Sequence, residues 1–257
     1  MTVWRSTIRA SLLAGLAAGG VAAVFTYVVL EPSIKVALAI EDARGVAQHE
    51  AGMPHAHEAV LVTRGWQQVG GAVAVIVTAL LLALVYSVLL TRFRLSWKVG
   101  ELPSALLVAA GCFTVFSLVP ALKYPANPPA VGDPSTINER TTLYFAVVVL
   151  SVLTATALLL VAGYARRGGW SSVRIAWTTA AVVATGAVLI IVGLPPGPGT
   201  IPADVPAALA WQFRVQSLGM LALLWATIGL VSGTLLARQA SLANASPAAQ
   251  RVVLTGW

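Results

Sequence analysis

The residues best suited to bind a metal ion are three histidines in one polar segment, residues 31–68. They are His49, His55 and His57, and Glu50 and Glu58 lie beside them in the sequence. Neutral imidazole binds Co²⁺, Ni²⁺ and Zn²⁺, and carboxylates can complete such sites. The histidines lack the i, i+4 spacing of a helical ligand pair, so we expect a transient site and no tightly bound cofactor. The alternative is a solvated loop whose histidines bind nothing.

A second polar stretch, residues 118–144, contains five prolines within fifteen residues. Each proline fixes its own φ and disfavours the α conformation in the residue before it, so the stretch is predicted to be rigid and non-helical. We expect it to be ordered, with the following helix beginning near Ser135 or beyond. It could be a rigid connector between membrane helices or a shaped binding surface. The candidate residues on this face are Lys123, Tyr124, Pro125, Asn127, Pro128, Pro129, Asp133, Thr136, Arg140, Trp211 and Arg214.

Two basic residues at this face have alternative roles. Arg214 lies about one turn inside the last apolar segment, so it could extend towards the membrane interface. It could instead pair with one of four acidic residues in the polar segments, which are Glu31, Asp133, Glu139 and Asp204. Lys123 has the same two possible roles. If it lines a metal path, its positive charge would make it an electrostatic barrier to a cation and not a ligand.

The composition identifies an integral membrane protein. The chain has 257 residues, of which 58% are hydrophobic and only 10% are charged, whereas soluble domains carry about 25% charged residues. Mean hydropathy is +0.85. The net charge of +7 is small, and we attribute it to topology signals and expect no nucleic-acid partner. The single cysteine, Cys112, allows no internal disulfide.

Six apolar windows are long enough to cross a bilayer, so we expect an all-α protein with six transmembrane helices and three ordered outer loops. Ten basic residues flank the windows on one side and five on the other, which predicts that both termini lie in the cytoplasm. We assign residues 1–238 to one membrane domain and 239–257 to a poorly ordered cytoplasmic tail. The windows are about 10–30, 69–91, 103–122, 142–164, 174–194 and 209–236.

Each outer hairpin begins with a proline at or just beyond an expected helix end and re-enters near an arginine. This pattern suggests a weak threefold helical-hairpin repeat, although convergence would produce it too. Glycines spaced by four at Gly15 and Gly19, and at Gly229 and Gly233, favour close packing of helices inside the bundle. The same spacing is also compatible with a homo-oligomer. The prolines in question are Pro32, Pro120 and Pro195, and the arginines are Arg64, Arg140 and Arg214.

Several reaction classes lack their motifs. The sequence has no G-x-x-x-x-G-K-[ST] and no H-E-x-x-H, so we expect neither ATP hydrolysis by this chain nor zinc-peptidase activity, and we predict no enzyme. The middles of the six windows contain no charged residue. Because a divalent cation loses much hydration energy in such a bundle, it would need backbone carbonyls freed by proline, or a partner subunit.

Three stretches resemble the CbtA family of bacterial membrane proteins, which are predicted cobalt transporter subunits. They are LVPALKYPANPPAVGDPSTINERTTLY at 118–144, the LP…P..VP…W.FR pattern at 194–214, and the opening with Arg9 and Ile40-Glu41. Thr200 stands where the family usually has an acidic residue. The resemblance implies uptake of a divalent metal, cobalt first, with a small single-span histidine-bearing partner. The alternative is a structural or accessory subunit of a larger membrane complex, with the outer loops as its docking surface.

Overall fold

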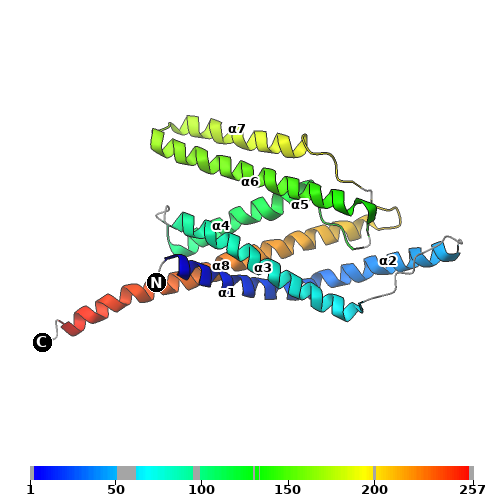
Figure 1. Ribbon diagram of the computed structural model, residues 1–257, viewed down its shortest axis with the longest axis horizontal. Helices are drawn as coiled ribbons and strands as arrows, with labels where there is room; N and C mark the ends of the chain where they lie inside the picture. Colours follow the sequence, from blue (N-terminus) through cyan, green and yellow to red (C-terminus); the bar gives the residue numbers. More distant parts are fainter. Residues whose placement is uncertain are drawn as a thin grey trace. The chain divides into compact units, whose positions relative to one another are not determined.

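The computed structural model describes residues 3–50, 62–94, 99–129, 131–132, 134–198 and 201–254, and all regular secondary structure in these ranges is helical (Figure 1). Six helical segments are long and apolar enough to cross a membrane, which confirms the prediction of an all-α protein with six spans. These segments are Val3–Ala47, Arg64–Arg94, Glu101–Lys123, Ile137–Gly168, Ser172–Ile191 and Ala207–Ala245.

The helices form two compact units, which are described separately. Unit 1 comprises Met1–Val29, His57–Phe113 and Gly219–Trp257. Unit 2 comprises Leu30–Ala56 and Thr114–Leu218. The division into one membrane domain, residues 1–238, and a cytoplasmic tail, residues 239–257, stays a prediction. Helix α8, Ala207–Leu254, continues through most of residues 239–257, since their alanines and leucines favour helix.

Unit 1 is held together by close contacts at small residues. Helix α1, Val3–Phe25, packs against α3, Arg64–Arg94, where Gly15 lies so close to α3 that a Cβ added there would be 2.6 Å from the Cβ of Ala83. Helix α4, Glu101–Phe113, approaches α8 equally closely, and a Cβ at Gly229 would lie 2.7 Å from the Cβ of Ala109. Both glycine pairs therefore serve packing inside the bundle, as predicted.

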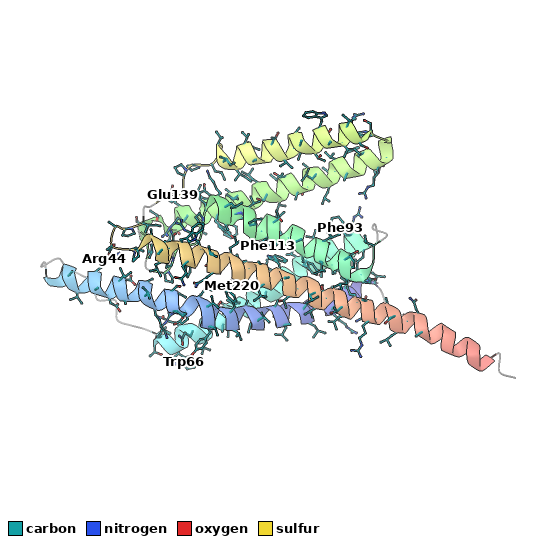
Figure 2. All side chains as sticks on the ribbon, turned by 180° about the vertical axis from the view of Figure 1, so that it is seen from behind. Arg44, Trp66, Phe93, Phe113, Glu139 and Met220 are labelled. Atoms are coloured by element: carbon teal, nitrogen blue, oxygen red, sulfur yellow. The ribbon has the colours of Figure 1, made fainter. Side chains whose placement is uncertain are left out.

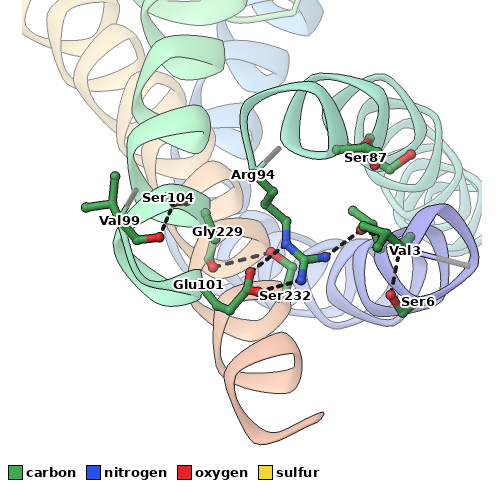
Figure 3. Close-up of polar contacts among 12 residues, drawn as sticks. Val3, Ser6, Ser87, Arg94, Val99, Glu101, Ser104, Gly229 and Ser232 are labelled. Atoms are coloured by element: carbon green, nitrogen blue, oxygen red, sulfur yellow. Dashed lines mark hydrogen bonds and ion pairs between the residues drawn. The ribbon is translucent and has the colours of Figure 1, made fainter. Parts of the chain in front are cut away.

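Polar contacts join three helices of unit 1 near one end of α3. Arg94 forms an ion pair with Glu101, with 2.5 Å between Nε and Oε2, and it also donates to Thr7 Oγ1 at 2.7 Å (Figure 3). These contacts connect α3 to α4 and α1. Further along α3, the buried Tyr86 hydroxyl donates to the Ala105 carbonyl oxygen at 2.9 Å and lies 3.0 Å from Ser232 Oγ.

The first polar segment begins as a helix, which differs from the expected helix end at Glu31-Pro32. A five-residue π turn, Thr26–Leu30, follows α1 and leads directly into α2, Glu31–Glu50. Pro32 cannot donate the usual hydrogen bond, and its ring would clash with the carbonyl of residue 28 in a regular helix. The wider π turn just before it accommodates this disruption, so the helix continues past the proline.

The same arrangement recurs in unit 2 at Pro120. The π turn Thr114–Leu118 precedes α5, Val119–Lys123, so Pro120 again occupies the second position after a π turn. Pro120 has no N–H for an α-helical bond to the Phe116 carbonyl oxygen, and Tyr144 Oη donates to that oxygen at 3.4 Å. The third proposed copy differs, because α7 ends at Ile191, before Pro195. A π turn just before the proline is therefore shared by the first two hairpins only.

The rest of unit 2 is a helical hairpin and its connections. A short 3₁₀ turn, Pro134–Thr136, leads into α6, Ile137–Gly168, which packs against α7, Ser172–Ile191. The start of α6 confirms the prediction that this helix begins near Ser135 or beyond, but α5 shows that the prediction of a wholly non-helical stretch from residue 118 was wrong, because Pro120 is tolerated in the first turn of a short helix. At the contact between the helices, a Cβ on Gly186 would lie 2.3 Å from Thr154 Oγ1. Elsewhere the side chains of both helices are mostly exposed (Figure 2).

Candidate functional site

Three segments of unit 2 that are distant in the sequence come together in what we call the loop assembly, namely α2, residues 119–132 and residues 192–216. A small hydrophobic cluster lies at its centre, in which Ala37 of α2, Val131 and Val205 are each at most 5% exposed. Leu209, from the start of α8, completes the buried cluster. Burying these side chains together favours one arrangement of the segments by the hydrophobic effect.

Lys123 and Tyr124 attach the proline-dense stretch to the end of α7. The Lys123 ammonium group donates to the carbonyl oxygens of Ile191 at 3.0 Å and Leu194 at 3.1 Å. The last carbonyls of a helix lack intrahelical donors and carry partial negative charge, so a cation stabilises them. Tyr124 Oη donates to the Pro195 carbonyl oxygen at 2.7 Å. Lys123 therefore caps the end of α7 in this structure, and its predicted role at the outer face stays a prediction.

Asn127 attaches the same stretch to α8. Its Oδ1 accepts a hydrogen bond from Arg214 Nη2 at 2.9 Å. The described partner of Arg214 is thus an amide and not one of the four acidic side chains. Its predicted extension towards the membrane interface stays a prediction. Arg214 Nε is buried and has no hydrogen-bond acceptor among the described residues.

Polar contacts attach helix α2 at two positions, one to the segment between α7 and α8 and one to α8 itself. Arg44 forms a bidentate ion pair with Asp204, with 2.9 Å from Nη2 to Oδ1 and 3.0 Å from Nε to Oδ2. Arg44 lies towards the free end of α2 (Figure 2). Three turns earlier, Ser33 Oγ donates to Gln216 Oε1 at 2.9 Å. Asp204 thus pairs with Arg44, not with Arg214.

The remaining predicted residues of this face have varied positions. Pro128 is buried and its carbonyl accepts from Val131 N at 3.3 Å, which closes a turn. Pro125 and Pro129 are exposed, and so is Trp211. Gly132 follows with φ of 121°, close to the Arg140 guanidinium. Thr136 precedes α6 without a side-chain capping bond, and Asp133 and Thr200 lie outside the described residues.

The predicted metal ligands are not tested by these coordinates. His49 and Glu50 are the last two residues of α2, and the placement of their side chains is not described. His55, His57 and Glu58 lie outside the described residues. Within the part of the chain that is described, no three His, Cys, Asp or Glu side chains gather closely enough to hold a metal ion.

The loop assembly can position segments and can present one buried carboxylate. Glu31, the first residue of α2, is 6% exposed and is the one buried acidic side chain among the described residues. Desolvation raises the pKa of Tyr124, which favours the protonated phenol that donates to the Pro195 carbonyl oxygen. The arrangement therefore combines joined polar segments with one buried carboxylate at the start of α2.

Sequence reasoning missed three features of this assembly. These are the helicity of residues 31–50, the Arg44–Asp204 pair and the Ser33–Gln216 contact. A signal for the helix was present, because residues 35–50 are rich in Ala, Glu, Lys and Arg, which favour helix. The expectation of a helix end at Pro32 concealed that signal. No sequence pattern specified which basic residue would pair with Asp204.

Comparisons with known proteins give one match. A family model described as probable cobalt transporter subunit (CbtA) matches residues 4–237. Comparison with curated proteins and with solved structures finds no match. The matched range includes every segment of the loop assembly.

Proposed function

This chain belongs to the CbtA family of probable cobalt transporter subunits, and we propose that it is a membrane subunit for uptake of a divalent transition metal, cobalt, acting with a partner subunit. The observation that carries the proposal is the family match over nearly the whole chain. It fits a six-span protein whose polar segments form an ordered assembly. We assign the chain no catalytic activity.

Helix α2 supports a capture role for the histidines. It contains 20 residues and is therefore about 30 Å long. His49 and Glu50 end this helix, and His55, His57 and Glu58 follow within eight residues. We propose that this segment collects Co²⁺, or Ni²⁺ and Zn²⁺, weakly at the far end of α2. Because protonated histidine cannot ligate, its binding would weaken below about pH 6.5.

Glu31 is the carboxylate that we propose the ion meets next. It lies at the opposite end of α2 from the histidines, directly after a π turn, and it is buried. A buried acidic residue in a membrane protein marks an ion path more often than a purely structural site. Transient ligation by Glu31 would lower the dehydration cost for a divalent cation entering spans that otherwise lack central charges.

The partner would supply the metal-binding side chains that the middles of these spans lack. The family description calls the protein a subunit, and we propose a small single-span protein with a histidine-bearing segment as the other part. A homo-oligomer is a further arrangement compatible with the exposed apolar faces of α6 and α7. We propose the bacterial inner membrane as the location, with both termini in the cytoplasm.

A second candidate function is that of an accessory subunit that organises a larger membrane complex. One observation favours it, namely that several polar side chains of the loop assembly join segments of the protein to one another. Lys123 caps α7, Asn127 binds Arg214, and Arg44 binds Asp204. In that case the assembly would be a docking surface, and loss of metal ligands would leave transport unchanged.

Uptake of radioactive Co²⁺ by a deletion strain carrying plasmid variants tests these alternatives. We expect the triple variant His49→Ala, His55→Ala, His57→Ala to reduce uptake at limiting Co²⁺ and to approach wild type at high Co²⁺. We expect Glu31→Gln to reduce uptake at all concentrations. Glu41→Gln is the matched control, since Glu41 is exposed on the same helix. Wild-type uptake in both test variants, at equal membrane abundance, would favour the accessory role.

A further inference from the structure

The turn between α6 and α7 carries a concentrated positive charge that the transport proposal does not use. Arg166, Arg167 and Arg174 lie within nine residues of chain, and all three are exposed. No acidic residue occurs anywhere between Glu139 and Asp204. Among the residues that the structure describes, none of the three arginines forms an ion pair. The turn is therefore a cationic patch without a neutralising partner from its own hairpin.

The turn is built in a defined conformation. Helix α6 ends at Gly169, whose φ of 58° is the left-handed conformation that glycine adopts without strain. Trp170 N then donates to the Ala165 carbonyl oxygen at 3.2 Å. Ser171 caps α7, because its side chain accepts from Arg174 N at 3.3 Å. Two helix caps thus fix the backbone that carries the three arginines.

Trp170 also fixes the position of one guanidinium group. The Arg174 guanidinium carbon lies 3.9 Å from the centre of the Trp170 ring, a close cation–π contact. The same ring folds back over Gly168, where an added Cβ would be 2.8 Å from Trp170 Nε1. Stacking occupies the face of a guanidinium group and leaves its N–H edge directed outwards, which suits bidentate binding of a phosphate.

The surroundings of the patch indicate a lipid. The spans Ile137–Gly168 and Ser172–Ile191 end and begin at this turn, so its residues lie at the level of the membrane surface. Tyr164 and Trp177 are 64% and 74% exposed, about one turn from the arginines, and aromatic side chains of this kind concentrate at headgroup level. Only 11% of each of the two apolar windows is buried inside the protein, so both helices offer apolar surface to acyl chains.

We propose that the α6–α7 turn binds the phosphate of an anionic phospholipid headgroup, through Arg166, Arg167 and the stacked Arg174. The headgroup would contact the arginine edges while its acyl chains lie along α6 and α7. Basic residues at a membrane surface attract anionic lipids, and each contributes roughly a fivefold change in binding. Three together predict a roughly 100-fold effect.

Native mass spectrometry of the purified full chain, titrated with phosphatidylglycerol in detergent, tests the site. We expect the variant Arg166→Gln, Arg167→Gln, Arg174→Gln to retain the lipid roughly 100-fold more weakly than wild type. The matched control Arg5→Gln, Arg238→Gln, Arg251→Gln removes the same charge elsewhere and should retain it as wild type does. Equal weakening in both variants, or in neither, would overturn the proposal.

Two further arms identify the source of the phosphate and do not depend on the triple variant folding. Phosphatidylcholine should bind wild type far more weakly than phosphatidylglycerol, and inorganic phosphate should not displace the lipid. Displacement by phosphate would show a free-anion site and refute the lipid assignment. On wild type, phosphatidylglycerol with a photoreactive headgroup should crosslink to residues 164–177. Crosslinks confined to other segments would also refute it.

Discussion

Arg44 and Asp204 are 160 residues apart in sequence and form a bidentate ion pair. The pair connects the free end of α2 to the segment between α7 and α8. Both side chains are partly exposed, at 30% and 47%. Exposed pairs contribute little to global stability, so this contact selects the position of α2 more than it stabilises the fold.

The first prediction concerns this pair. We expect Arg44→Gln and Asp204→Asn each to lower the free energy of unfolding by no more than about 1 kcal/mol. In a double-mutant cycle the coupling energy should be about 0.2–1 kcal/mol and should decrease with added salt. Thermal unfolding in detergent measures it. A coupling energy near zero at low salt would mean that the pair does not hold α2.

The second prediction concerns the cap on α7. We expect Lys123→Met to destabilise the protein by about 1–2 kcal/mol, because the carbonyls of Ile191 and Leu194 lose a charged donor. The control is Lys35→Met, which removes the same charge from an exposed position on α2. Equal stability of the two variants would contradict the capping role.

The third prediction uses the raised pKa of Tyr124. Only the protonated phenol can donate to the Pro195 carbonyl, and desolvation favours that form in the folded protein. The contribution is therefore fully present below the ordinary tyrosine pKa of about 10 and is lost as pH rises through the higher folded value. The stability difference between wild type and Tyr124→Phe should be constant up to about pH 10 and should shrink over the range above it. A constant difference over that range would refute this.

The helices could be predicted from sequence because membrane spans are specified by length and apolarity, which are local properties. All six were found. The continuation of α1 into α2 was not, because it depends on how a helix accommodates Pro32. A π turn at Thr26–Leu30 solves that problem, and no composition rule distinguishes it from a helix end. The helical extension of α8 beyond Arg238 was missed for lack of an apolar pattern.

The candidate site was predictable only in part. Lys123, Tyr124 and Asn127 were identified as important, but their hydrogen-bond partners were not, since all of these are backbone carbonyls or side chains more than 65 residues away in the sequence. Pairings of this kind depend on tertiary structure. The histidine site stays a prediction, and so does the role of Glu31, whose burial the sequence did not indicate.

The fourth prediction tests the helix contacts of unit 1. We expect Gly15→Ala to cost about 1–3 kcal/mol, because its Cβ would lie 2.6 Å from that of Ala83 and must force α1 and α3 apart. Gly20→Ala is the matched control on the same helix. A Cβ at Gly20 meets no atom within 4 Å, so this change should be neutral or slightly stabilising. If both variants unfold at the same temperature, close packing at Gly15 is not important for stability.

The last prediction is the membrane topology. Ten basic residues flank the spans on the side of both termini and five on the other, which predicts cytoplasmic termini. In a Cys112→Ala background, single cysteines at Pro129 and at Arg167 should react with an impermeant reagent from opposite sides. Both positions are exposed. We choose Arg167 for the inner position because a cysteine at the neighbouring Gly168 would collide with the Trp170 ring.

In intact cells the cysteine at Pro129 should be labelled and the one at Arg167 protected, and opened cells should label both. This outcome would place the loop assembly outside the cytoplasm, where incoming metal arrives, and the α6–α7 turn inside. The reverse pattern would place the histidine segment in the cytoplasm and contradict a capture role in uptake. Labelling of both positions from one side would contradict the odd number of crossings that α6 provides between them.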